Sequence, residues 1–293
     1  MHKYIFISLI SILFLASCED VVDVELNEGE SQLVVDAWLD NNSQRQEIRL
    51  TQSAPYFDSS FAPIVENAEV SVSSDNGTSY EFQYEGNGVY VHMLASNETL
   101  GNVGDNFELE IAIDDKRYIA QTTMHRVPQI DSIVQEFREA EVFTDEGIYC
   151  QFYARDLSGL GDTYLIKTFK NDIFLNLPFE INLAYDAGFD SGGEVDGLIF
   201  ISPIRELINE NDLDGIPIPY VPGDEVRVEI HSISNDAFAF MEIMRDQLLN
   251  SNSGLFAEPL ANAPGNVTHA NGNETVLGVF NVAAVASKVK LIE

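Results

Sequence analysis

Short stretches in which apolar and polar residues alternate dominate the chain from Leu33 to Thr122, as expected for strands that bury one face. Asp75-Asn76-Gly77-Thr78 separates two of these stretches, and its Asn-Gly pair tolerates the positive φ of a tight hairpin. The predicted strands are Leu33–Leu39, Gln46–Thr51, Val70–Ser73, Ser79–Tyr84, Val89–Met93, Phe107–Ile113 and Arg117–Thr122. Their near-regular spacing predicts an immunoglobulin-like or transthyretin-like β-sandwich over residues 32–126.

A second β-rich domain is predicted over residues 127–293, because Pro128 favours an extended boundary and new strand patterns follow it. These patterns are Ile133–Phe137, Ile148–Arg155, Thr163–Phe169 and Glu225–Ile233, with an apolar closing strand pair at Val276–Ala286. A loop insertion rich in proline and glycine occupies residues 171–223. Insertions of that length without regular structure are often functional.

One amphipathic helix is predicted over residues 235–249. Ala237, Met241, Met244 and Leu248 recur at helical spacing, and Ser234 or Asn235 can cap the N-terminus. We expect this helix to pack on the second sheet. The predicted fold class is therefore all-β dominated, with a sandwich followed by a second β-rich domain that carries one packed α-helix.

The first 17 residues have the features of an export signal. His2 and Lys3 precede an apolar run from Tyr4 to Leu15, which is shorter than the roughly 20 residues that span a bilayer. Leu15-Ala16-Ser17-Cys18 resembles a bacterial lipobox, which implies a covalent lipid on Cys18 and a mature chain that begins there. An ordinary signal peptide with an incidental cysteine is the alternative.

Residues 18–31 are predicted to form an acidic tether. Glu19 and Asp20, directly after Cys18, resemble the signal that sends Bacteroidota lipoproteins to the outer face of the outer membrane. A solvated run of charge explains the same residues, and both interpretations can hold together. We expect acyl chains to anchor the protein in the outer membrane, with the folded part facing the cell exterior.

The chain is strongly acidic, with 48 Asp and Glu against 15 Lys and Arg and a formal net charge of −33 at pH 7. This charge repels phosphate backbones and excludes nucleic acid as a partner. A hydrophobic content of 45% predicts a folded core rather than disorder. Cys150 lies in a strand pattern, so we expect a buried core thiol rather than a nucleophile.

The sequence contains no zinc-protease motif, serine-hydrolase elbow, phosphate-binding loop or Cys-x-x-Cys pair, and we predict neither catalytic residues nor enzymatic activity. Glu210, Asp212 and Asp214 before Gly215 resemble the opening of a calcium loop. Val221 stands where such a loop needs a bidentate Glu, which favours an acidic turn over a structural Ca²⁺ site. A second acidic loop, equally non-specific, contains Asp186, Asp190, Glu194 and Asp196.

Two segments are candidate contacts for a partner or ligand. Tyr56, Phe57 and Phe61 lie in a loop that also contains proline and serine, and they either cap the sandwich or contact a partner. Tyr220 lies in the proline-rich segment Ile216–Pro222, which must be extended and has the same two alternatives.

Several segments of the mature chain together carry a family resemblance: Cys18–Asp23, Leu33–Leu39, Leu50–Phe57, Asn67–Val72, Val127–Ile133, Phe256–Pro259 and Val276–Phe280. In these segments the chain resembles the Bacteroidota lipoprotein family called domain of unknown function 4249. That family has no assigned reaction, so the resemblance implies no catalytic residue. It implies a setting, because such lipoproteins are typically encoded beside TonB-dependent transporters of the outer membrane.

We therefore expect a non-enzymatic, surface-exposed lipoprotein that assists a TonB-dependent barrel. Residues 53–63 and 171–223 are the expected contacts with ligand or with the barrel rim. A free-standing adhesin or a glycan- or peptide-binding protein is the alternative, and a surface hydrolase that uses acidic residues is a further one. Beyond the lipid on Cys18 no cofactor is expected, with structural Ca²⁺ as the open alternative.

Overall fold

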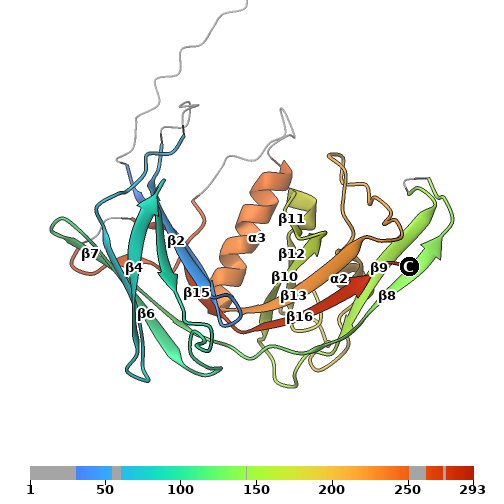
Figure 1. The fold of residues 1–293 in the computed structure, drawn as a ribbon, viewed down its shortest axis with the longest axis horizontal. Helices are drawn as coiled ribbons and strands as arrows, with labels where there is room; N and C mark the ends of the chain where they lie inside the picture. The colour runs from blue at the N-terminus through green and yellow to red at the C-terminus, as the bar shows by residue number, and fades with distance from the viewer. Residues whose placement is uncertain (1–30, 55–60, 143, 251–261, 273–274) are drawn as a thin grey trace, which may run out of the picture. The chain divides into compact units, whose positions relative to one another are not determined.

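Strands make up most of the regular structure, which confirms the predicted all-β class (Figure 1). The computed structural model describes residues 31–54, 61–142, 144–250, 262–272 and 275–293. Within these residues α3 (Asn235–Asn250) is the one helix of more than two turns. No helix in this part of the chain has the length and apolar character needed to cross a membrane.

The larger sheet has nine strands in the part of the chain that the structure describes. They are β1 (Leu33–Asp40), β2 (Arg45–Gln52), β3 (Glu69–Ser74), β4 (Ser79–Gly86), β5 (Val89–Met93), β6 (Asn106–Ile113), β7 (Lys116–Thr123), β14 (Thr268–His269) and β15 (Leu277–Ala283). Their order across the sheet is β14-β7-β6-β3-β4-β5-β2-β1-β15. The predicted Asn-Gly turn joins β3 to β4, and Gly77 adopts the left-handed conformation that this turn requires, with φ +91°.

This sheet curls until β15 contacts β7. Asn266 links the two strands, because its side chain accepts the N–H of Phe280 at 2.9 Å and donates to the carbonyl oxygen of Gln121 at 3.4 Å. Gly278, at φ +93°, lets β15 approach β1, since a Cβ there would lie 1.9 Å from the carbonyl oxygen of Val35. The curl encloses the first hydrophobic core, so the inner face of the sheet is buried as it would be between the two layers of a sandwich.

A five-stranded sheet and a two-stranded hairpin form the rest of the described β structure. The five strands are β10 (Thr163–Lys170), β11 (Ile173–Leu175), β12 (Asn182–Tyr185), β13 (Glu225–Ile233) and β16 (Val285–Leu291). The hairpin consists of β8 (Ile130–Arg138) and β9 (Gly147–Ala154), and two short helices are η1 (Pro178–Glu180) and α2 (Ser202–Glu206). The second core lies among these elements and includes Phe152, Tyr164 and Phe200.

The last two strands of the chain connect the sheets. β15 pairs in parallel with β1, with Phe280 opposite Ala37, whereas β16 pairs with β13 in the five-stranded sheet. Only Ala284 separates them, and its backbone N–H donates to the hydroxyl of Ser232 on β13 at 2.9 Å. The predicted boundary after residue 126 falls between β7 and β8, but strands from beyond it complete the first sheet.

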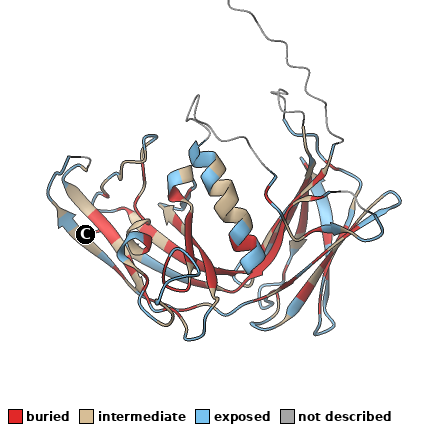
Figure 2. Ribbon diagram, turned by 180° about the vertical axis from the view of Figure 1, so that it is seen from behind, coloured by how far each residue is buried: buried red, intermediate tan, exposed pale blue. Residues whose placement is uncertain are grey.

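Helix α3 begins after Ser234, whose hydroxyl oxygen accepts the N–H of Ala237 at 3.1 Å, as a predicted N-cap should. Ala237 and Phe238 are buried against β10, β12, β13 and β15. The later turns of α3 are half-buried or exposed, as Figure 2 shows along the helix. The predicted apolar stripe is therefore covered only in its first part, and Leu248 is 43% exposed.

Candidate functional site

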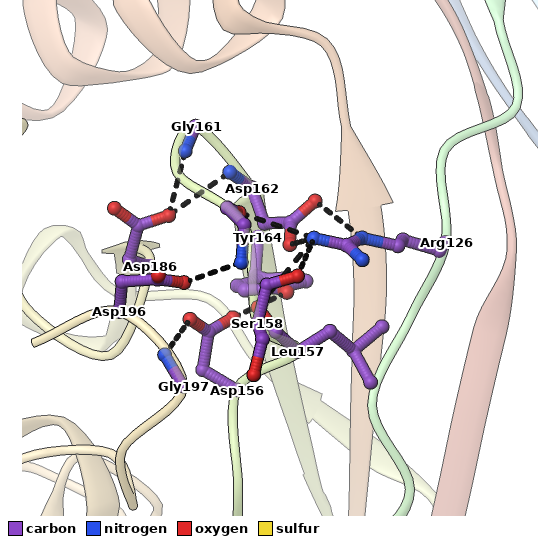
Figure 3. A network of polar contacts seen from close by, with 11 residues as sticks. Arg126, Asp156, Leu157, Ser158, Gly161, Asp162, Tyr164, Asp186, Asp196 and Gly197 are labelled. Carbon is purple, nitrogen blue, oxygen red and sulfur yellow. Dashed lines mark hydrogen bonds and ion pairs between the residues drawn. The ribbon is translucent and has the colours of Figure 1, made fainter.

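Three aspartates from separate segments converge beside the start of β10. One carboxylate oxygen each from Asp156, Asp186 and Asp196 lies within 4.8 Å of the other two. Asp156 and Asp186 are buried, with exposed fractions of 3% and 2%, and Asp196 is half-buried. Figure 3 shows the three side chains close together, and we call this group the three-aspartate cluster.

Backbone pairing places these residues together. Asp156 follows β9, and its N–H donates to the carbonyl oxygen of Leu198 at 2.9 Å, which draws the loop that carries Asp196 alongside. Asp186 follows β12, which pairs with β10, and its own N–H donates to the carbonyl oxygen of Asp162 at 2.7 Å. At Asp186 the chain has φ +49°, a conformation in which Asp is over-represented among residues other than glycine.

Each carboxylate of the three-aspartate cluster accepts hydrogen bonds from a neighbouring segment. The Asp186 carboxylate accepts the N–H groups of Gly161 and Asp162 at 2.8 and 3.0 Å, and Asp196 accepts that of Gly159 at 2.8 Å. Asp156 accepts the N–H of Gly197 at 3.0 Å and the Tyr164 hydroxyl at 2.7 Å. The cluster thus ties together the loops around residues 156–162 and 186–197.

Burial dominates the electrostatics of Asp156. Burial raises the pKa of the Asp156 carboxyl, and hydrogen bonds from Tyr164 and Gly197 oppose that shift. Burial also raises the pKa of Tyr164, with a further contribution from Asp156, so the phenol remains a donor. Arg126 faces the opposite side of the same loop, where its guanidinium pairs with Asp162 at 2.6 Å (Figure 3).

The chemistry of the three-aspartate cluster is that of hard cations, because Ca²⁺ and Mg²⁺ take oxygen ligands of this kind. Asp156, Asp186 and Asp196 are the described residues that could hold such an ion. The N–H and O–H groups that already donate to these carboxylates also give the cluster a structural role that needs no metal.

The predicted calcium loop has a different arrangement. Glu210 pairs with the ammonium of Lys170 at 2.7 Å, and Asp212 accepts the N–H groups of Asp214 and Ile216, each at 2.9 Å. The loop is therefore an acidic turn closed by its own backbone, and its carboxylates do not converge with others in the described residues. A structural calcium ion stays a prediction.

The predicted lipidation site Cys18, the predicted export signal Glu19 and Asp20, and the predicted contacts Tyr56 and Phe57 all lie outside the described residues. Phe61 is fully exposed.

Tyr220, by contrast, is only 2% exposed. Its hydroxyl donates to the carbonyl oxygen of Ile208, and its N–H donates to that of Ile148 on β9 at 2.8 Å. Of the two alternatives predicted for this extended segment, the structure shows packing at Tyr220, whose side chain is buried in the second core and is not available as a contact.

Cys150 is a buried free thiol, as predicted. Burial raises the pKa of this thiol to about 12, which leaves almost no thiolate at neutral pH. The amide of Asn209 accepts the N–H of Cys150 at 2.8 Å and donates to its carbonyl oxygen at 2.9 Å, so both backbone groups are satisfied.

One family model, described as a domain of unknown function (DUF4249), matches residues 19–289. No curated protein matches the chain.

Proposed function

On the premise that the chain belongs to the family described as domain of unknown function (DUF4249), we propose that it is a surface-exposed lipoprotein of the outer membrane. Its role is that of a non-enzymatic, ligand-binding accessory subunit of a TonB-dependent transporter. Acyl chains on Cys18 hold it in the membrane, and the described strands form the part outside.

The observation that carries this proposal is the sequence Leu15-Ala16-Ser17-Cys18, an apolar run ended by small residues and a cysteine. Glu19 and Asp20 follow at once and support export to the cell surface. Anchoring by several acyl chains is stable, whereas a single chain gives only marginal membrane binding.

Exposed apolar side chains on the β8–β9 hairpin support a protein partner. Val134, Phe137 and Val142 are 41%, 67% and 87% exposed, and all three belong to this short two-stranded element. Val134 and Phe137 point to opposite faces of the hairpin, so each face offers an exposed apolar side chain to a partner, and Phe137 is the larger of the two.

The bonding of the three-aspartate cluster supports a non-enzymatic role. A catalytic acid or base needs a lone pair or proton directed at substrate, within about 3 Å of the atom it serves. Asp156 and Asp186 are instead buried and accept N–H groups of the loops around them. These contacts serve the fold.

Metabolic labelling with an alkyne fatty acid tests the anchor, because the chain has only two cysteines. We expect label on the native chain and on a Cys150→Ser variant, and none on Cys18→Ser. Label that persists in Cys18→Ser, or a native chain that takes up none, would refute the proposal.

Affinity purification after gentle detergent extraction tests the partner. We expect a large β-barrel protein to accompany the native chain, and Phe137→Glu to reduce its amount. Val103→Glu is the matched control, because Val103 is a comparably exposed apolar residue (54%) outside the hairpin. A native chain that elutes alone supports the free-standing adhesin, and equal recovery with Phe137→Glu excludes the hairpin as the contact.

A further inference from the structure

A mostly apolar pocket of about 290 Å³ lies beside α3, between β1 of the nine-stranded sheet and β10 of the five-stranded sheet. Trp38, Leu165, Phe174, Ile181 and Met241 contribute to its wall. Its volume is close to the lower end of the roughly 300–1,000 Å³ that small-molecule pockets occupy. Such a cavity suits a compact ligand with a large apolar surface.

Two charged side chains also line this pocket, and they differ in what they can offer to a ligand. The carboxylate oxygens of Glu180 are both occupied, since one accepts the N–H of Leu177 and the other that of Asn211, each at 2.8 Å. Lys167 is half-buried, and no hydrogen bond or ion pair within 4.0 Å engages its ammonium in the part of the chain that the structure describes. The pocket therefore presents one available charge, and it is positive.

Two of the three acidic groups around Lys167 make close contacts of their own. Asp40 accepts the N–H groups of Asn42 and Ser43 at 2.8 and 2.6 Å, and Glu229 pairs with His231 at 3.1 Å. Burial lowers the pKa of the Lys167 ammonium, while the charges of Asp40, Glu229 and Asp36 oppose that shift from a distance. A desolvated ammonium without a direct counter-ion gains most from a ligand that supplies a carboxylate.

We propose that this pocket binds a small molecule that carries one carboxylate on an apolar body. The carboxylate accepts a charge-assisted hydrogen bond from Lys167 Nζ, and the body contacts Trp38, Phe174 and Met241. This inference names the ligand class for the ligand-binding role proposed above and rests on that role alone, not on the lipid or the barrel.

Trp38 makes the test direct, because it is the only tryptophan in the chain and it lines the pocket. The full chain in small phosphatidylcholine vesicles is titrated with 3-phenylpropionate and octanoate, and Trp38 fluorescence is followed. The neutral probes 3-phenylpropanamide and octanamide have nearly the same shape. We expect a saturable change with the acids and at least about tenfold weaker binding of the amides.

Variants of Lys167 separate charge from packing. In Lys167→Met, binding of the acids should weaken to the level of the amides. Lys167→Arg should retain most of the affinity for the acids. Lys288→Met is the matched control, since that exposed ammonium contacts only the carbonyl oxygen of Asp131 among the described residues. Urea unfolding of each variant verifies that it is folded.

Acids and amides that bind the native chain equally, or acids that bind Lys167→Met as well as the native chain, would overturn the carboxylate assignment. No saturable change with any of the four probes would overturn the pocket itself. Either result leaves the co-purification with a barrel unaffected, so the two proposals fail separately.

Discussion

Replacing Asp186 by alanine should destabilise the protein more than replacing any exposed acidic residue of the same loop. The Asp186 carboxylate is 2% exposed and accepts two backbone N–H groups, at 2.8 and 3.0 Å. Each hydrogen bond to a charged group contributes roughly 1.5–3 kcal/mol, which gives an upper range of about 3–6 kcal/mol for the pair. Gly161 and Asp162 are only half-buried, so water recovers part of this loss. We expect a decrease of about 2–4 kcal/mol in the free energy of unfolding.

Urea unfolding monitored by Trp38 fluorescence measures this change. Asp186→Asn keeps an oxygen that can accept both N–H groups, so the free energy of unfolding should fall by only about 1 kcal/mol. Asp190→Ala is the matched control, because Asp190 is exposed and, among the described residues, accepts only the N–H of Gly192, at 3.1 Å. Its effect on the free energy of unfolding should stay within about 0.5 kcal/mol. A free energy of unfolding for Asp186→Ala equal to that of Asp190→Ala would refute a structural role for the cluster.

Three further predictions concern other buried groups. Asn209→Ala leaves the N–H and carbonyl of Cys150 unpaired, and the free energy of unfolding in urea should fall by about 2–4 kcal/mol. Cys150 should not react with a thiol reagent such as DTNB until urea unfolds the chain, because it is fully buried and its pKa is raised to about 12. Burial lowers the pKa of His231, so the unfolded chain binds more protons and stability should fall as pH decreases below about 6.5. Urea midpoints between pH 5 and 8 should show this loss for the native chain and a flatter profile for His231→Gln.

Local patterns predicted much of the fold because strands and caps depend on nearby residues. The alternation from Leu33 to Thr122 predicts the positions of β1 to β7, and Ser234 predicts the start of α3. Strand partners depend on contacts that no local pattern contains. The parallel pairing of β15 with β1 joins residues about as far apart as the chain allows, so the sequence alone did not place the closing strands in the first sheet.

The three-aspartate cluster was only partly predictable for the same reason. Asp186 and Asp196 belong to an acidic loop that the sequence reveals, but in a chain with 48 acidic residues such a loop is not specific. Asp156 has no signal of its own, since it is brought close by contacts of its segment with residues 197–200, such as the backbone contact with Leu198. Tyr220 was a candidate contact and is buried instead. The prolines around it predict extended backbone, but they do not predict which side of that backbone is covered.

Strand β10 connects the cluster with the pocket. Tyr164 reaches the three-aspartate cluster from one face of β10, and Leu165 and Lys167 lie on the other face, toward the pocket. The bonds of Asp186 hold the start of β10, where Thr163 pairs with Tyr185 of β12. A slip of one residue would exchange the two faces and turn Lys167 into the second core. The register that the cluster supports is therefore the physical condition for the charge of Lys167 to meet a ligand.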